Sequence, residues 1–405
     1  MWNRRRLLKT TGSSLALIPF ARTLSGCQNQ GNLDQMNAEV SLGLYNPSDF
    51  SEPKDALMNG LTDVDFSWLS NGDSVLIKVA SNSGRPHPAT TSPEAIKGLV
   101  ETLFAHGAGR VLVADQAGVQ QVRLVEGDIR FRSTEEMFRR NGLLDATVDS
   151  GAEPYFFDDH GFNAGYFEAT LPMGHHWQKP AMIPTIIRDV DHIVYAPRIS
   201  SHTLSGYTHG HKLAIGWLRD DSRNHLHHDA ATFYEKYTEV SYAAEIREKL
   251  RLTVSFCTSV LLNNGPDFGT VADLDQWLLL VSTNLAHHDT VSVGILNYFT
   301  QVTPSDPNGG APEGPWANFF NFLFLNYVVP QATGMEWGPD GIVGYTHYLA
   351  HAWPHGVHWD RSLSRAYDID GPIPEDIVLY LQGQEPGEEL RKVLETHSNG
   401  ILTLT

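Results

Sequence analysis

Residues 73–118 read DSVLIKVASNSGRPHPATTSPEAIKGLVETLFAHGAGRVLVADQAG. The largely apolar and β-branched run Val75–Ala80 predicts a strand that is buried on both faces. A second run of this kind, Val111–Ala114, follows after about thirty residues, which is room enough for a helical crossover. The stretch therefore predicts a βαβ unit whose two strands pair in parallel.

The segment between these strands has the signals of a helix. Ser92 is a favourable N-cap, and Pro93 then occupies the first helical position. The apolar residues that follow recur with helical spacing, at Ile96, Leu99, Val100, Leu103 and Phe104. Gly107 and Gly109 end the helix before the second strand.

Similar patterns continue along the chain and predict an α/β fold with helices covering mostly parallel sheets. Further strands are expected at 40–44, 154–157, 192–196 and 252–262, and helices near 134–141, 230–250 and 388–397. Ligands of such sheets bind at the carboxyl ends of the strands. The loops 81–91 and 198–212 directly follow predicted strands, so we expect a binding site there.

The first residues resemble a bacterial export leader. Arg4 and Arg5 stand in a twin-arginine context, a short apolar run follows, and Leu24-Ser25-Gly26-Cys27 resembles the box at which lipoproteins are cleaved and acylated on cysteine. We expect the leader 1–26 to be removed and Cys27 to carry the lipid anchor on the periplasmic side of the membrane. The alternative is an ordinary basic, apolar helix. Twin-arginine export carries folded proteins, which favours a cofactor acquired in the cytoplasm.

The remaining length exceeds what one hydrophobic core usually organises, so two α/β domains are expected, at 27–225 and 226–405. The chain has 29 Lys and Arg against 47 Asp and Glu, a formal net charge of −18. Such a surface repels phosphate backbones, so nucleic acid is not an expected partner. The chain has two cysteines, and if Cys27 carries lipid, Cys257 has no second cysteine to pair with. This argues against a disulfide framework and against cysteine-based metal sites.

Residues 202–216 read HTLSGYTHGHKLAIG, which combines histidines with one lysine. Imidazoles bind divalent metals, and a desolvated lysine such as Lys212 can act as a nucleophile or as a covalent cofactor handle. His202 precedes this lysine, and His225, His227 and His228 follow it. The alternative without a functional role is a histidine-rich surface loop with a solvated lysine.

The wider segment 191–217, DHIVYAPRISSHTLSGYTHGHKLAIGW, resembles the family called domain of unknown function 362 (DUF362) and the corresponding segment of nickel-pincer lactate racemases. The loop 82–88, NSGRPHP, is similar to the Asp-x-Thr-Arg-Pro-x-Pro loop of those racemases. The resemblance covers about residues 60 to 300. It implies a small-molecule substrate and a divalent metal, in the form of a nickel-pincer nucleotide.

The resemblance also implies roles for single residues. Lys212 would hold the pincer cofactor, with Gly206 and Gly210 in the glycine positions beside it. His202 would be a catalytic acid/base, and Arg85 would hold the cofactor or substrate. His228, with His225 near it, would complete the nickel coordination. An anchored pyridinium accepts a hydride while an imidazole takes the hydroxyl proton.

Three positions depart from the racemase pattern. Asn82 replaces the loop aspartate, and His209 replaces one glycine of a Gly-Gly pair. The region of the second catalytic histidine offers only Asp115 and two glutamines. Because two-base racemisation needs an acid/base on each face of the substrate, we expect one-sided alcohol oxidation, or epimerisation with Asp115 serving the second face.

Two histidine groups in the second half have plainer interpretations. The segment around His287, His288 and Asp289 resembles a DUF362 stretch, with Asp289 at its first aspartate; a polar helix-to-strand turn is favoured there over a metal site. The second group is His347, His351, His355 and His358. Pro354 ends any helix shared by these residues, so a packed aromatic surface is favoured.

Three functions are compatible with these features. The first is a lipid-anchored enzyme that uses a metal-containing cofactor for hydride or proton transfer on a small hydroxy acid or alcohol. The second is a hydrolase in which a bound divalent metal activates water. The third is an envelope lipoprotein that binds a ligand without catalysis. The lysine and the arginine loop favour the first, since water activation requires neither.

Overall fold

The computed structural model describes the chain from the first strand onward, with gaps. The described residues are 40–202, 205–227, 229, 232–262, 265–267, 269–304, 361–371, 376–397 and 402–405. The predicted leader, Cys27, His228 and the histidines from His347 to His358 lie outside these residues.

The βαβ unit predicted from residues 73–118 is confirmed. Strand β2 (Ser74–Val79) leads through α2 (Pro93–Ala105) to β3 (Arg110–Asp115), and the two strands pair in parallel. The Ser92 hydroxyl caps α2 by accepting the Ala95 N–H at 3.4 Å. Because side chains alternate along a strand, Val75, Ile77 and Val79 pack in the same core as α2, whereas Leu76 packs in the core on the other face. Lys78 shares this second face.

One large sheet organises the molecule and is mostly parallel, as expected. Its order is β15-β14-β1-β13-β12-β9-β2-β3-β6. The strands not yet bounded are β1 (Val40–Tyr45), β6 (Glu153–Phe156), β9 (His192–Ala196), β12 (Leu250–Leu262), β13 (Thr270–Ser282), β14 (Ile377–Gly383) and β15 (Leu402–Leu404). Only β13 runs antiparallel to its neighbours β1 and β12 along this path. The sheet continues across the predicted domain boundary at residue 225, since β12 pairs with β9.

Smaller strands extend from this framework. The strands β10 (Ser200–His202) and β11 (Gly206–Thr208) form a hairpin that joins the sheet beside β12. Two separate ribbons are β4 (Val122–Val125) with β5 (Asp128–Phe131), and β7 (Tyr166–Glu168) with β8 (Met182–Pro184).

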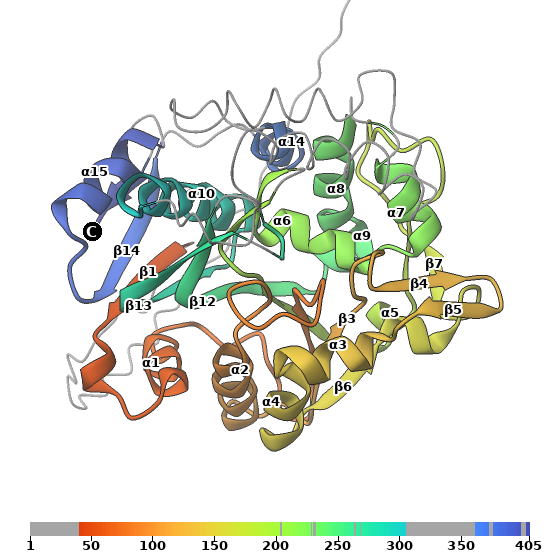
Figure 1. Cartoon of the computed structure of the whole chain (residues 1–405), viewed down its shortest axis with the longest axis horizontal. Coiled ribbons are helices and arrows are strands. Elements are labelled where there is room, and N and C mark those ends of the chain that lie inside the picture. The colour runs from red at the N-terminus through yellow and green to blue at the C-terminus, as the bar shows by residue number, and fades with distance from the viewer. Residues whose placement is uncertain are drawn as a thin grey trace, which may run out of the picture. The chain divides into compact units, whose positions relative to one another are not determined.

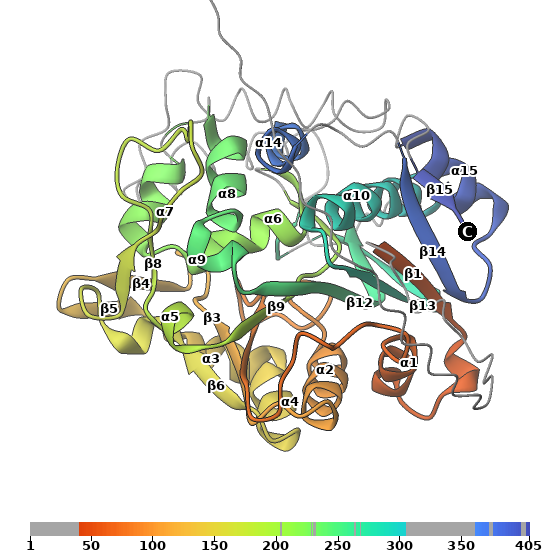
Figure 2. The ribbon, with the colours of Figure 1, turned by 180° about the vertical axis from the view of Figure 1, so that it is seen from behind.

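Helices cover both faces of the sheet (Figure 1). One face carries α1 (Pro53–Gly60), α2, α3 (Thr134–Asn141) and α4 (Leu143–Asp149). The other carries α6 (Gly210–Leu213), a 3-10 turn (Ala214–Trp217), α7 (Asp220–His227), α8 (Phe233–Ser241), α10 (Leu285–Val302) and α14 (Arg361–Asp370). The view from behind shows the same layers, with α15 (Glu388–His397) beside α10 (Figure 2). The remaining helices, α5 (Ile186–Asp189) and α9 (Ala244–Arg247), are single turns.

Two local predictions need correction. The helix expected over 230–250 is divided into α8 and α9, because Tyr242 and Ala243 leave the helical path between them. The segment 287–289 is a helix start after a strand, not the expected helix-to-strand turn. The Asn284 side chain caps α10 there, accepting the N–H groups of Ala286 at 2.9 Å and His287 at 3.1 Å.

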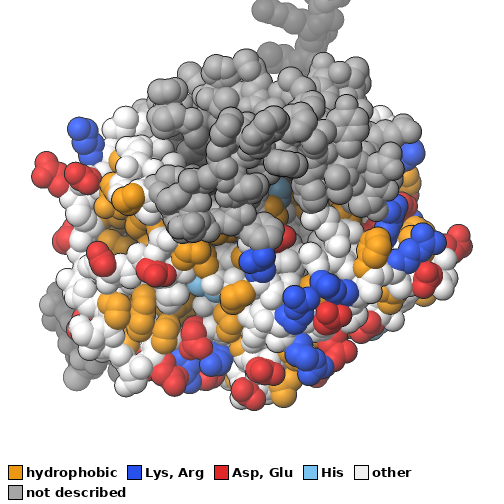
Figure 3. Space-filling view, in the orientation of Figure 1, with side chains coloured by type: hydrophobic (Ala, Val, Ile, Leu, Met, Phe, Trp, Pro, Cys, Tyr) orange, Lys and Arg blue, Asp and Glu red, His pale blue; other side chains and the backbone are white. Residues whose placement is uncertain are grey.

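Acidic and basic side chains are interspersed on the described part of the face in Figure 3. Exposed ion pairs such as Arg110–Glu153, at 2.6 Å between β3 and β6, fit this mixed surface. Within the described ranges, no helix is both long and apolar enough to span a bilayer.

Candidate active site

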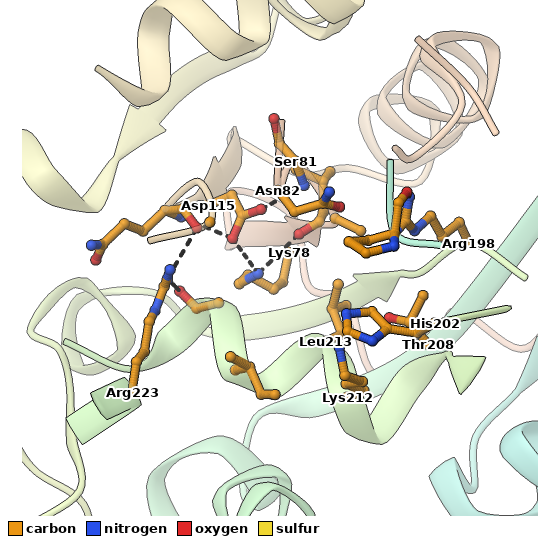
Figure 4. A pocket seen from close by; sticks show the side chains of 17 residues that line it. Lys78, Ser81, Asn82, Asp115, Arg198, His202, Thr208, Lys212, Leu213 and Arg223 are labelled. Atoms are coloured by element: carbon orange, nitrogen blue, oxygen red, sulfur yellow. Dashed lines mark hydrogen bonds and ion pairs between the residues drawn. The ribbon is translucent and has the colours of Figure 1, made fainter. Parts of the chain in front are cut away.

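A cavity of about 90 Å³ lies where the parallel strands β2, β3 and β9 end. Its walls come from the loops that follow these strands and from the β10–α6 segment. The polar side chains that line it include Lys78, Asp115, Arg198, His202 and Lys212 (Figure 4). The cavity therefore occupies the edge of the sheet at which the sequence predicts a ligand site.

Lys78 and Asp115 form a buried ion pair on one side of this cavity. Lys78 Nζ lies 2.6 Å from Asp115 Oδ1, and the residues are 0% and 3% exposed. Burial lowers the pKa of Lys78, and the Asp115 carboxylate opposes that shift. Asp115 also accepts the N–H groups of Ser81 at 2.6 Å and Gln116 at 2.8 Å. The pair thus fixes the loops after β2 and β3 relative to each other.

Gly216 makes room for this ion pair. A Cβ atom at this position would overlap both Lys78 Nζ and Asp115 Oδ1. The close approach of backbone to a buried charge pair is a reason for glycine here. The 3-10 turn that contains Gly216 thereby closes one wall of the cavity.

Lys212 and His202 lie on the opposite side, and both are half-buried. Burial, followed by the charges of Lys212 and Arg198, lowers the pKa of His202 well below its usual value of 6.5. Burial and the Arg198 charge likewise lower the pKa of Lys212 well below 10.5. The imidazole is therefore neutral at pH 7, and the amine is biased toward its nucleophilic form.

Asp289 positions the segment that carries Lys212. Its carboxylate accepts the N–H of Gly210 at 2.8 Å and the N–H of His211 at 2.9 Å, at the start of α6. It also accepts hydrogen bonds from His211 Nδ1 at 2.7 Å and His288 Nδ1 at 2.9 Å. Burial raises the pKa of Asp289, but these histidines outweigh it and the net shift is downward. This carboxylate thus ties α10 to the lysine segment from outside the cavity.

A sequence profile described as "Domain of unknown function (DUF362)" matches residues 75–294, which is more than half of the chain. The chain belongs to the DUF362 family. The matched range runs from β2 into α10 and includes all the residues that line the cavity. The family resemblance stated from the sequence is therefore confirmed.

One solved structure similar to this DUF362 protein is the lactate racemase apoprotein from Thermoanaerobacterium thermosaccharolyticum. Sequence identity is 12%, and the TM-score is 0.38. The match covers 64% of the present chain and 57% of that chain, so it spans less than two thirds of the racemase. No match was found among curated proteins.

The structure brings three of the predicted site residues of this DUF362 protein into one cavity: His202, Lys212 and Asp115. Arg85 is exposed in the 81–91 loop and is not among the lining residues. Its backbone carbonyl accepts the Thr90 hydroxyl at 2.9 Å. Of the four side chains expected to converge, those at 202 and 212 line the cavity and that of Arg85 does not, while His228 lies outside the described residues.

The other predicted ligands lie elsewhere. Gly206 pairs with His202 in the β10–β11 hairpin, and Gly210 donates to Asp289, so both shape the backbone beside the cavity. His225 lies on α7 with its ring 5.7 Å from that of Trp177, and it does not line the cavity. In the part of the chain that the structure describes, no group of three or more His, Cys, Asp or Glu side chains could hold a metal ion.

Three charged residues that line the cavity are not identified by the sequence analysis: Lys78, Arg198 and Arg223. Lys78 carries a local signal, because it is the only charged residue in an otherwise apolar strand, SVLIKV. Arg198 lies two residues after the end of the buried strand β9. Arg223 donates to the carbonyls of Gln116 at 3.0 Å and Ala117 at 2.7 Å, which ties α7 to the loop after β3.

Proposed function

We propose that this cavity is the active site of an enzyme that transfers a proton or hydride on a small hydroxy acid or alcohol. One observation carries the proposal: a neutral imidazole and an amine of lowered pKa, His202 and Lys212, face one cavity at the carboxyl ends of parallel strands. Groups with strongly shifted pKa values that share a cavity favour acid–base or nucleophilic chemistry.

In this proposal, His202 accepts the proton of the substrate hydroxyl. Asp115 already accepts three hydrogen bonds, from Lys78, Ser81 and Gln116, so its role is to hold the cavity wall and the Lys78 charge. Epimerisation through Asp115 would require breaking that pair. The arrangement therefore favours one-sided chemistry, with His202 as the single base.

Lys212 fits the role of a covalent cofactor handle, because its amine reaches the cavity with a lowered pKa. A pyridinium group attached there would supply the hydride acceptor. For the nickel part of a pincer cofactor, the described residues provide no cluster of three or more ligands. We therefore assign no step to a metal.

The test is intact-mass and metal analysis of the natively exported protein. Beyond the mass of the lipid proposed for Cys27, a second adduct is expected on the wild-type chain, to be lost in Lys212→Ala and retained in Lys179→Ala, a control at an exposed lysine. A second adduct that persists in Lys212→Ala would remove the assignment. A bare chain with zinc or manganese would favour a metal-dependent hydrolase, and a bare, metal-free chain a ligand-binding lipoprotein.

We also propose export by the twin-arginine translocase and anchoring through a diacylated Cys27, on the basis of the leader sequence. Metabolic labelling with a radioactive fatty acid is expected to label the wild-type protein but not Cys27→Ala. Replacing Arg4 and Arg5 by lysine is expected to retain the precursor in the cytoplasm. Labelling of Cys27→Ala would contradict the anchor.

A further inference from the structure

Arg198 is a buried cation at the cavity with hydrogen-bonding capacity left over. It follows β9, is 2% exposed and lines the cavity. Its Nη1 donates to the carbonyl of Pro266 at 3.0 Å and, at the long limit of 3.5 Å, to that of Pro88. Its Nε is buried and has no hydrogen-bond partner among the described residues. An unsatisfied buried donor on a charged group is costly unless a ligand supplies the acceptor.

The charges around the cavity do not balance. Lys78 is neutralised by Asp115, and Arg223 lies 4.0 Å from Asp220 while donating to backbone carbonyls. Arg198 has no carboxylate within 4.0 Å among the residues that the structure describes. Asp267 and Asp115 act on it only at longer range; Asp267 Oδ1 accepts a hydrogen bond from Asn82 at 2.7 Å, and Asp115 is paired with Lys78.

The free edge of Arg198 has the geometry of a carboxylate fork. Because Nη1 is held by backbone carbonyls, the edge formed by Nε and Nη2 remains for a ligand. Two parallel N–H groups on such an edge match the two oxygens of a carboxylate. Figure 4 places Arg198 on the same side of the cavity as His202 and Lys212.

We infer that this cavity binds a small carboxylate whose two oxygens pair with the Nε–Nη2 edge of Arg198, next to Lys212 and His202. The inference rests on the proposed function in taking this carboxylate to be part of the substrate. It gives Arg198 the role that sequence resemblance gave to Arg85. Of the substrates proposed above, it selects hydroxy acids over uncharged alcohols.

The test is calorimetric titration of the purified full chain with glycolate and lactate, each against its uncharged amide, glycolamide or lactamide. The acids are expected to bind at least about tenfold more tightly than the amides, which is the usual scale of a charge-assisted hydrogen bond. Equal affinity for acid and amide, or no binding of either acid, would overturn the inference.

Two arginine variants sharpen this test. Arg198→Gln is expected to weaken lactate binding at least about tenfold, while the exposed Arg85→Gln leaves it unchanged. Should Arg198→Gln fail to fold, Arg198→Lys keeps the charge without the fork and is expected to bind lactate more weakly than wild type. Wild-type affinity in both Arg198 variants, or a loss confined to Arg85→Gln, would contradict the assignment.

The two proposals fail in different ways. Arg198-dependent carboxylate binding without any adduct on Lys212 would leave the anion site standing and remove the proposed cofactor chemistry. An adduct on Lys212 in a protein that binds amides as well as acids would support the cofactor chemistry and remove the anion site at Arg198.

Discussion

Two sides of one cavity carry buried positive charge in different ways. On the β2–β3 side, Lys78 is paired with Asp115 at 2.6 Å, and the pair is almost completely buried. On the β9–α6 side, Arg198 and Lys212 lie together, and neither forms an ion pair with a described carboxylate. Figure 4 shows these two sides facing each other.

The difference separates residues that support the cavity wall from residues that bind a ligand. A paired buried charge is held in place by its partner and by the loops that both residues tie down. An unpaired one is kept at an energetic cost, because desolvation disfavours its charged form. Such a cost is expected where a ligand or the chemistry uses the group. The first side therefore forms the wall of the cavity, and the second forms its reactive surface.

Breaking the paired side is expected to have the largest effect on stability. Asp115→Ala leaves Lys78 buried without a counter-ion, which costs about 3–5 kcal/mol of unfolding free energy. Urea unfolding at neutral pH measures this loss. The matched control is Glu153→Ala, which removes the exposed ion pair with Arg110 and costs at most about 1 kcal/mol. Similar losses in both variants would mean that the buried pair is no more important than a surface one.

Asp289 lies outside the cavity and supports the side that carries Arg198 and Lys212, because it holds the start of α6. Its substitution therefore tests how far that side depends on a buried carboxylate. Asp289→Asn is expected to cost about 2–3 kcal/mol, because an amide accepts fewer of the four hydrogen bonds that this carboxylate receives. Asp273→Asn, at an exposed position on β13, is the control and is expected to change little.

The same variant has a defined pH dependence. The folded-state pKa of Asp289 lies below its unfolded value, so the carboxylate stabilises the fold fully above the unfolded pKa of about 4. That contribution is lost progressively as pH falls below about 4 toward the folded pKa. The stability difference between wild type and Asp289→Asn should therefore be constant near neutral pH and shrink in acid. A difference that grows in acid would contradict this assignment.

Removing the unpaired lysine is expected to have the smallest effect. Lys212→Met should leave stability within about 1 kcal/mol of wild type, or raise it, since no described ion pair is lost. The folded pKa of Lys212 is lowered, so the unfolded chain binds a proton that the folded chain releases. Wild-type stability therefore rises with pH toward the unfolded pKa of about 10.4, and any advantage of the variant shrinks over that window.

Unfolding curves of both proteins between pH 7 and the unfolded pKa check this expectation, with Lys179→Met as the solvent-exposed control. A loss from Lys212→Met as large as that from Asp115→Ala would show that the two sides of the cavity do not differ.

Periodicity and capping residues in the sequence predicted individual helices and strands better than the contacts between distant segments. Helices α3 and α15 have the bounds expected from the sequence, and the βαβ unit of residues 73–118 is present. The start of α10 was mistaken for a turn, because the polar segment 287–289 resembles one locally. Its side chains are buried because α10 packs against distant segments, and Asp289, for example, contacts α6, which lies about eighty residues earlier in the chain.

The sequence by itself determined six strands of the large sheet, the Ser92 cap of α2 and the two loops that border the cavity, because apolar periodicity and capping act over a few residues. It also pointed to His202, Lys212 and Asp115. Only the tertiary structure decided which charges are neutralised. Lys78 meets Asp115 through the parallel register of β2 and β3 and the close approach of Gly216, while Arg198 meets no carboxylate among the described residues. Burial and pairing depend on contacts between distant segments, which no short stretch of sequence specifies.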